Sequence, residues 1–268
     1  MLDTGLQGKR ALVTGGGVGI GLAIAQRLAD EGVHIAIANR NDYPAAVRDM
    51  ESRGVQAVSI QADVSREEDI ERMVAEATDQ LGGLDLYVNN VAAHWDAPLT
   101  KVDSDGWQKT VATNLTSCMF GVREVARRMI AQQSGTILII GSTARFTLYP
   151  GEISYRVTKS ALVETMEAMA AELAPHQIRV NMLTPGLFIT RMTEALDFQG
   201  EAMSQVMADI PLHRPGDAFH ELAPTAVLLL SDQLSGYTTG ANFLVDGGVK
   251  LRVCNWRSPD ELREMNLP

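Results

Sequence analysis

Short apolar runs alternate with longer amphipathic stretches along almost the whole chain. The apolar runs predict buried strands at residues 10–14, 33–38, 57–60, 84–88, 136–140, 178–183 and 242–245. The stretches between them have helical spacing, at residues 19–31, 43–53, 66–81, 104–131, 154–174 and 217–231. A Ser65-x-x-Glu68 capping box is expected to open the third helix. Buried strands joined by crossover helices predict an α/β fold, with an open, doubly wound parallel sheet of about seven strands flanked by helices in a single domain.

The first predicted strand and helix are joined by a glycine-rich turn. Residues 15–21 have the sequence Gly-Gly-Gly-Val-Gly-Ile-Gly. Glycine lets the backbone turn sharply and approach a pyrophosphate, whose charge is favoured by the free N–H groups of a helix N-terminus. The spacing Gly15-x-x-x-Gly19-x-Gly21 differs from the G-x-G-x-x-G form. Because a strand and a helix flank it, the turn favours a dinucleotide site over a plain glycine-rich loop.

Near the middle of the chain, Tyr155 and Lys159 are four residues apart, and Ser142 precedes the tyrosine. On a helix this spacing places the tyrosine and the lysine on one side. A phenol has a reference pKa of about 10, and a nearby ammonium is expected to lower it, so that the tyrosine can give and take a proton. A serine hydroxyl after a strand could hold a substrate oxygen beside it. Most Tyr-x-x-x-Lys pairs are solvated helix surface, so the glycine turn upstream gives this one its weight.

Further motifs occur in the order and spacing of one known family. They are residues 14–21, Asp63-Val64, Asn89-Asn90-Val91-Ala92, Asn114, Ser142, Tyr155-x-x-x-Lys159, Pro185-Gly186, 239–240 and 245–248. From about residue 6 to residue 248 the chain resembles the short-chain dehydrogenase/reductase family. The resemblance implies a Rossmann-type dinucleotide-binding and catalytic domain over residues 1–248, and hydride transfer between a nicotinamide and a carbonyl or alcohol.

The resemblance also implies roles for individual residues. Catalysis would rest on Asn114, Ser142, Tyr155 and Lys159. Ser142 and Tyr155 would bind the carbonyl oxygen, Tyr155 would exchange the proton, and Lys159 would lower its pKa and hold the nicotinamide ribose. Asn114 would hold a water that extends proton transfer. The cofactor would contact Gly15, Gly17, Val18, Gly19, Ile20, Asn39, Arg40, Asp63, Val64, Asn90, Ala92, Tyr155, Lys159, Pro185, Gly186 and Thr190.

The end of the second predicted strand bears on cofactor choice. NAD-binding Rossmann proteins usually carry an acid here for the ribose 2′-hydroxyl, whereas a nearby arginine accommodates a 2′-phosphate. Position 39 is Asn and position 40 is Arg, and an arginine fork suits a phosphate dianion. We therefore expect NADP(H) to be preferred, with NAD(H) possible. Val18 argues the other way, since many NADP-preferring relatives carry a basic residue in the glycine turn.

Substrate identity is less constrained than the cofactor. The pocket candidates share a position in loops next to the catalytic motifs: His94, Trp95, Thr143, Arg145, Tyr149, Glu152, Leu187, Phe188 and Met192. Their mixture of aromatic and charged groups suggests a medium-sized polar substrate, such as a sugar, a polyol or a hydroxy acid. Loop charges such as Arg145 and Glu152 equally often point into solvent. The five histidines form no ligand-spaced pair, so we assign no metal.

Composition limits the partners. The chain has 268 residues and a formal net charge of −10, which argues against nucleic acid or an anionic membrane as the main partner. Its two cysteines are too few for a disulfide framework. Without an apolar signal core or a run long enough to span a bilayer, a cytoplasmic protein is the expectation.

Two segments fall outside the regular pattern. Residues 186–216 follow a Pro-Gly turn and are expected to form a mobile lid over the substrate. In the tail, residues 249–268, a helix start at Ser258 and a large Trp256 suggest packing on a neighbouring subunit; a loose terminus is the alternative. The resemblance implies a homotetramer assembled through the helices at 104–131 and 154–174.

Three functions remain in competition. The first is an NADP-dependent reductase or dehydrogenase for a small-molecule carbonyl or alcohol. The second is an NAD-dependent polyol, sugar or hydroxy-acid dehydrogenase of the same family. The third is a catalytically silent nucleotide-sensing protein, which the intact set of catalytic candidates disfavours. Enoyl reduction is also disfavoured, because those relatives space the tyrosine and lysine more widely.

Overall fold

The structure is a computed structural model that describes residues 3–148, 150–190 and 201–251. Its centre is one seven-stranded sheet in the order β3-β2-β1-β4-β5-β6-β7, and all neighbouring strands are parallel. The strands are β1 (Arg10–Thr14), β2 (His34–Asn39), β3 (Ala57–Gln61), β4 (Leu86–Asn89), β5 (Gly135–Ile140), β6 (Ile178–Pro185) and β7 (Asn242–Val245). The predicted fold class is confirmed.

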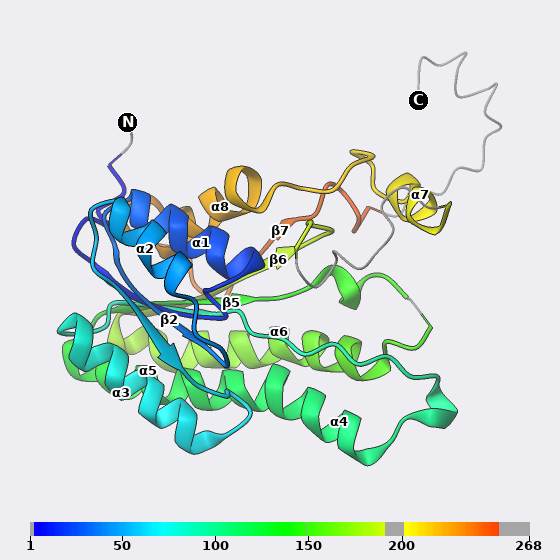
Figure 1. The fold of residues 1–268 in the computed structure, drawn as a ribbon, viewed down its shortest axis with the longest axis horizontal. Helices are drawn as coiled ribbons and strands as arrows, with labels where there is room; N and C mark the ends of the chain where they lie inside the picture. The colour runs from blue at the N-terminus through cyan, green and yellow to red at the C-terminus, as the bar shows by residue number, and fades with distance from the viewer. Residues whose placement is uncertain (1–2, 149, 191–200, 252–268) are drawn as a thin grey trace, which may run out of the picture.

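Helices cover both faces of the sheet (Figure 1). One face carries α1 (Gly19–Asp30), α2 (Pro44–Ser52) and α8 (Ala223–Leu230). The other face carries α3 (Glu67–Leu81), α4 (Ser104–Val111), α5 (Ser117–Gln132) and α6 (Ile153–Leu173). Two shorter helices are α7 (Glu201–Ala208) and α9 (Asp232–Ser235), and single turns lie at Leu99–Lys101, Thr143–Arg145 and Ala174–His176.

Each face of the sheet has its own hydrophobic core. Successive strand side chains point to opposite faces, so Leu12 packs in the cluster that includes α3, α5 and α6, whereas Val13 packs in the cluster with α1, α2 and α8. In β5, Ile139 likewise packs in the first cluster and Ile140 in the second. Because both faces are covered, these strands are apolar at nearly every position rather than at alternate ones.

The strand order reverses direction between β1 and β4, and this is where the site forms. A doubly wound sheet binds its ligands outside the carboxyl ends of the strands at such a point. Thr14, at the end of β1, joins the two strands: its hydroxyl donates to the Val88 carbonyl at 3.3 Å and accepts from the Asn90 amide at 2.9 Å. The Asn90 side chain donates to the Thr14 carbonyl at 3.0 Å.

Three local predictions were wrong or incomplete. The predicted helix 104–131 is interrupted by a π-helical turn at Ala112–Thr116. The Ser65 capping box is absent, because the Ser65 hydroxyl instead donates to Asp63 at 2.7 Å and α3 begins at Glu67. The predicted lid contains α7, which the sequence pattern did not indicate.

Ser258 and Trp256 lie outside the described residues. Within the described ranges, no helix has the length and apolar character needed to cross a membrane.

Candidate active site

A cavity of about 780 Å³ lies at the carboxyl ends of the central strands. It brings together most of the predicted site residues, from the cofactor candidates as well as the catalytic candidates. From those predictions it is lined by Gly15, Val18, Gly19, Ile20, Asn39, Arg40, Asp63, Val64, Asn90, Ala92, His94, Ser142, Tyr155, Lys159, Pro185, Gly186, Leu187, Phe188 and Thr190. The predicted cofactor and catalytic residues therefore share one continuous space.

Six described residues of the predicted site do not line this cavity. Those are Gly17, Asn114, Trp95, Thr143, Arg145 and Glu152. Tyr149 and Met192 lie outside the described residues. The sequence analysis missed Asn41, Tyr43, Ala62, Ser65, Val91, Ala93, Lys109, Thr113, Ile140 and Gly141. Lys109 and Thr113 are four residues apart, so on one helix they lie on the same side.

The glycine turn packs so closely against neighbouring backbone and side-chain atoms that two of its glycines have no room for a Cβ. Gly15 has a φ of +68°, in the left-handed region that favours glycine. A Cβ on Gly21 would collide with the Gly15 carbonyl and approach the Asn90 amide nitrogen to 2.6 Å. One on Gly17 would overlap the Tyr43 ring. A side chain is thus excluded at Gly17 and Gly21, and Val18, Gly19 and Ile20 at the start of α1 line the cavity, where a helix N-terminus favours an anion.

The end of β2 offers hydrogen-bond donors to the cavity. Asn39 is buried, and its Oδ1 accepts from the Gly17 amide at 3.2 Å. Among the described residues, its buried Nδ2 has no partner, and such a group is costly unless a ligand satisfies it. The exposed Arg40 follows. Burial opposes ionisation of Asp63, yet hydrogen bonds from Ser65 and the charge of Arg40 hold the pKa of its carboxyl below the usual value.

The catalytic candidates meet at the other end of the cavity. Ser142 follows β5, whereas Tyr155 and Lys159 lie on the first turns of α6. Burial raises the pKa of Tyr155, and hydrogen bonding to Ser142 only partly opposes this. The Lys159 Nζ donates to the Ile140 carbonyl at 2.9 Å and lies 5.9 Å from the Tyr155 ring centroid. Burial lowers the pKa of Lys159 to about 8.

The predicted lowering of the Tyr155 pKa is therefore wrong for this structure. The four-residue spacing places the lysine on the correct side of the helix, but its ammonium is directed at the Ile140 carbonyl. Removal of the phenol from water outweighs the neighbouring groups. The spacing correctly predicts that the two residues are neighbours, but it does not determine their charge.

Known proteins resemble this chain over nearly its whole length. A family model described as enoyl-(acyl carrier protein) reductase matches residues 16–250. The 3-oxoacyl-(acyl-carrier-protein) reductase of Staphylococcus epidermidis is 33% identical over 244 residues, which cover 90% of this chain and 98% of that protein. Dehydrogenase/reductase SDR family member 4 of Mus musculus is 34% identical over 258 residues, 92% of this chain and 89% of that protein.

Solved structures agree with these relatives. A putative short-chain alcohol dehydrogenase from Sinorhizobium meliloti is 33% identical, with a TM-score of 0.90, and the match covers 94% of this chain and 100% of that one. The chain belongs to the short-chain dehydrogenase/reductase family. A putative 2-deoxy-d-gluconate 3-dehydrogenase from Agrobacterium tumefaciens, solved with bound NADP, is 28% identical with a TM-score of 0.86, over 93% of this chain and 99% of that one.

Membership of this family makes the chain an oxidoreductase that acts on a CH–OH or C=O group of a small molecule with a nicotinamide cofactor. The silent nucleotide-sensing alternative is thereby set aside. The chain spans nearly the whole length of these relatives, so the family fold is present in full.

Asn114 occupies the π-helical turn between α4 and α5 and is almost fully buried. Its Oδ1 accepts from the Ala93 amide at 2.6 Å, and its Nδ2 donates to the Ala93 carbonyl at 2.9 Å and to the Thr158 hydroxyl at 3.1 Å. The turn thus fixes the loop after β4, which carries His94 into the cavity, against α6.

His94 sits within a small cluster of charged side chains beside the catalytic tyrosine. Its Nε2 lies 3.2 Å from the Glu152 Oε1 and its Nδ1 lies 3.5 Å from the Asp96 Oδ1. Its ring meets the Tyr155 ring edge to face, with centroids 4.6 Å apart. The potential metal-binding atoms of the three charged residues fall within 4.8 Å of one another. Since the imidazole nitrogens face the two carboxylates, we describe the group as ion pairs, and the expectation of no metal stays a prediction.

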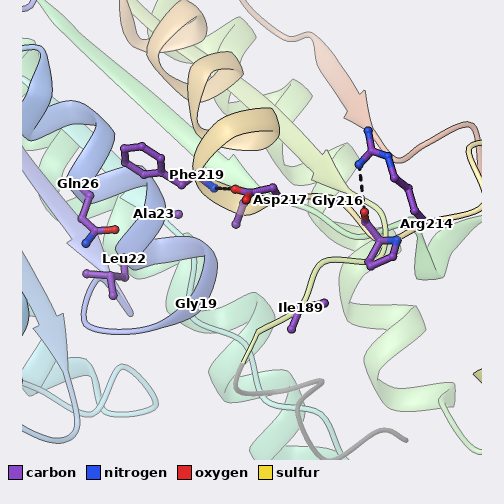
Figure 2. A pocket seen from close by; sticks show the side chains of 11 residues that line it. Gly19, Leu22, Ala23, Gln26, Ile189, Arg214, Gly216, Asp217 and Phe219 are labelled. Carbon is purple, nitrogen blue, oxygen red and sulfur yellow. Dashed lines mark hydrogen bonds between the residues drawn. The ribbon is translucent and has the colours of Figure 1, made fainter. Parts of the chain in front are cut away.

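A second pocket, of about 440 Å³, lies on the other side of the glycine turn. Figure 2 shows Leu22 and Gln26 of α1 on one side of it and Arg214 on the other. The Arg214 guanidinium donates to both oxygens of Glu221, at 2.8 and 2.6 Å. That carboxylate neutralises its charge, whereas Arg40 lines the larger cavity.

Proposed function

We propose that this chain is an NADP(H)-preferring oxidoreductase that interconverts a carbonyl and a secondary alcohol, with Tyr155 as the general acid and base. The observation that carries the proposal is that Ser142, Tyr155 and Lys159 open into the same cavity as the glycine turn. Hydride transfer needs the cofactor and a proton donor side by side, and this cavity is the place where both fit.

When bound, the nicotinamide supplies or takes the hydride. The other steps fall to the chain. Ser142 and Tyr155 bind the carbonyl oxygen, Tyr155 gives its proton to the oxygen as negative charge develops there, and Lys159 holds the cofactor ribose and stabilises the phenolate. Asn114 holds the water from which the proton is replaced. Oxidation of an alcohol follows the same path in reverse.

The preference for NADP(H) is supported by the end of β2. An acid at position 39 would accept hydrogen bonds from the ribose hydroxyls, whereas Asn39 presents a buried Nδ2 donor without a partner among the described residues. A phosphate has only acceptors, so a donor there and the Arg40 fork beyond it complement a 2′-phosphate.

NAD-dependent oxidation of a polyol, a sugar or a hydroxy acid is the second candidate. It is favoured by Val18, which lines the cavity in the glycine turn and contributes no cation. For the substrate, His94 and Phe188 line the cavity, and we propose that they form one polar and one apolar side of its binding region. The names of the relatives add 3-oxoacyl thioesters and 2-deoxy-d-gluconate to the compounds worth screening.

Cofactor binding tests the proposal first. We expect fluorescence titration to show tighter binding of NADPH than of NADH. Arg40→Gln should weaken NADPH binding by about tenfold or more, because a charge-assisted fork to phosphate is lost, and should leave NADH binding unchanged. The matched control is Arg48→Gln on the exposed side of α2. A wild-type preference for NADH would overturn the NADP assignment, and binding of neither would remove the basis for the reaction.

We further propose the domain arrangement and assembly. Residues 1–248 act as the dinucleotide-binding and catalytic unit, residues 186–216 as its lid, and residues 249–268 as a tail against a neighbouring subunit. Exposed apolar side chains on α4, α5 and α6 support a homotetramer through these helices: Trp107, Met119 and Val157. Light scattering of Met119→Glu should then show smaller assemblies, and an unchanged mass would count against this interface.

A further inference from the structure

The Asp96–His94–Glu152 cluster lies against the catalytic tyrosine without belonging to the catalytic set. Glu152 immediately precedes α6, and Tyr155 lies in the first turn of that helix. His94 reaches the same place from the loop after β4 and contacts both: the carboxylate at 3.2 Å and the tyrosine ring at 4.6 Å between centroids. The imidazole therefore joins Glu152 to the Tyr155 ring.

We propose that His94 is a positioning residue for Tyr155: its imidazolium holds Asp96 and Glu152 in an ion-pair cluster and so sets the charge that the phenol faces. This rests on the proposed role of Tyr155 as the general acid and base. His94 does not exchange a proton with the substrate; it acts through its two contacts.

The electrostatics follow from the groups that surround the two rings in the described part of the chain. Asp96 and Glu152 face His94, whose pKa is held above its usual value by the Glu152 hydrogen bond and the two negative charges, against the effect of burial. Tyr155 is faced by Ser142, Glu152 and, from its own helix, Lys159. After burial, the negative charge of Glu152 is what raises the pKa of Tyr155.

These contacts determine whether protonation of His94 makes Tyr155 a stronger or a weaker proton donor. While His94 is protonated, it neutralises Glu152, and the phenol is the stronger acid. As the pH rises through the pKa of His94, the imidazolium is lost, Glu152 acts on Tyr155 unopposed, and the phenol becomes a weaker proton donor. We therefore expect carbonyl reduction to lose efficiency across this range, on the order of threefold for one unit charge at this separation.

The first test needs no substrate. In the full-length protein, ¹³C-labelled histidine and tyrosine rings are followed by NMR against pH, with signals assigned by His94→Gln and Tyr155→Phe. The Tyr155 signal should inflect at the pH where His94 titrates. Glu152→Gln should shift both inflections to lower pH, and His94→Gln should abolish the Tyr155 inflection. A Tyr155 signal that ignores the His94 titration would overturn the proposal, whatever the outcome for the reaction.

The second test uses the reaction itself, with ethyl acetoacetate and NADPH as the probe. The wild-type profile of kcat/KM against pH should fall through a midpoint that matches the His94 midpoint from NMR. The profile of His94→Gln should lack this step, and that of Glu152→Gln should show it at lower pH. A merely structural role would instead lower kcat/KM equally at every pH. That result, or a step that persists in His94→Gln, would contradict the proposal.

The matched control is His220, which also pairs with a carboxylate, Asp217 at 3.2 Å, and meets an aromatic ring, Phe219, with centroids 5.1 Å apart. It has one carboxylate partner where His94 has two, and it lies far from Tyr155 in the sequence and outside the cavity. His220→Gln should leave both the NMR inflection and the pH profile unchanged. Absence of any reduction by the wild type would contradict the proposed function alone, because the NMR titration still decides the role of His94.

Discussion

Replacement of Lys159 by methionine should stabilise the folded protein at neutral pH while it abolishes activity. Burial lowers the pKa of this lysine from 10.5 to about 8, which corresponds to about 3 kcal/mol of penalty for keeping the ammonium buried. Methionine fills a similar volume without a charge. It also removes the donor to the Ile140 carbonyl, a loss of about 1 kcal/mol. The expected net gain in the free energy of unfolding is about 2 kcal/mol.

The gain should depend on pH in a defined direction. Below pH 8 the lysine is protonated in both the folded and the unfolded chain, so the whole penalty acts on the folded state. Between about 8 and 10.5 the unfolded chain holds a proton that the folded chain has lost, so wild-type stability rises with pH. The advantage of Lys159→Met is therefore largest at pH 7 and shrinks as the pH approaches 10.

Urea unfolding of the wild type and of Lys159→Met, at pH 7 and at pH 9.5 and at matched protein concentration, measures this directly. Lys101→Met is the control, because Lys101 is exposed in the short turn after the β4 loop and its charge is solvated. The reasoning is refuted if Lys159→Met is less stable than the wild type at pH 7, or if the difference between them is the same at both pH values.

Two further perturbations test the backbone cradle and the sheet. Gly21→Ala should lower the unfolding free energy by about 1–3 kcal/mol, as thermal melts would show, and weaken NADPH binding, because its Cβ collides with the Gly15 carbonyl. Arg179→Met should cost about 1–3 kcal/mol in urea unfolding, because the Leu229 and Thr238 carbonyls lose the buried guanidinium as their donor. Asp232→Asn should cost at least as much, because it leaves that buried cation without its carboxylate partner.

Much of the fold was predictable because burial on both faces of a parallel sheet leaves a strong signal. Continuous apolar runs gave β1 and β7 with the observed limits and the other strands to within two residues at each end. The errors occur where a side chain chooses among local partners. Ser65 could cap α3 or donate to Asp63. The position of Asp63, shortly after β3, decides in favour of the hydrogen bond to Asp63.

The π-helical turn at Ala112–Thr116 illustrates a second limit. Residues 104–131 have the pattern of one continuous helix, and intrinsic propensity carries no mark of the interruption. The widened turn is stabilised by hydrogen bonds from Asn114 to a loop distant in sequence. Tertiary contacts of this kind override local preference, so the position of the turn could not be derived from the helix alone.

For the candidate site, the outcome depends on whether a residue lies on a regular element or in a loop. Residues fixed by the ends of strands and the first turns of a helix, such as Ser142, Tyr155 and Lys159, line the cavity. Two of the residues chosen because they neighbour these in sequence, Arg145 and Glu152, do not line it. A loop places successive side chains in unrelated directions, so proximity along the chain does not determine which of them reach the substrate.

The charges of Tyr155 and Lys159 show why geometry and electrostatics must be considered separately. Burial favours the neutral form of each, raising the pKa of the phenol and lowering that of the ammonium. For carbonyl reduction, a neutral phenol is the required starting state, since the tyrosine must still carry the proton that it gives. The negative charge appears only as that proton leaves. Lys159 then acts on a phenolate in a site shielded from water, where a nearby cation has its greatest effect. In the reaction that we propose, the lysine would thus stabilise the charge that forms as the proton leaves rather than a phenolate present beforehand.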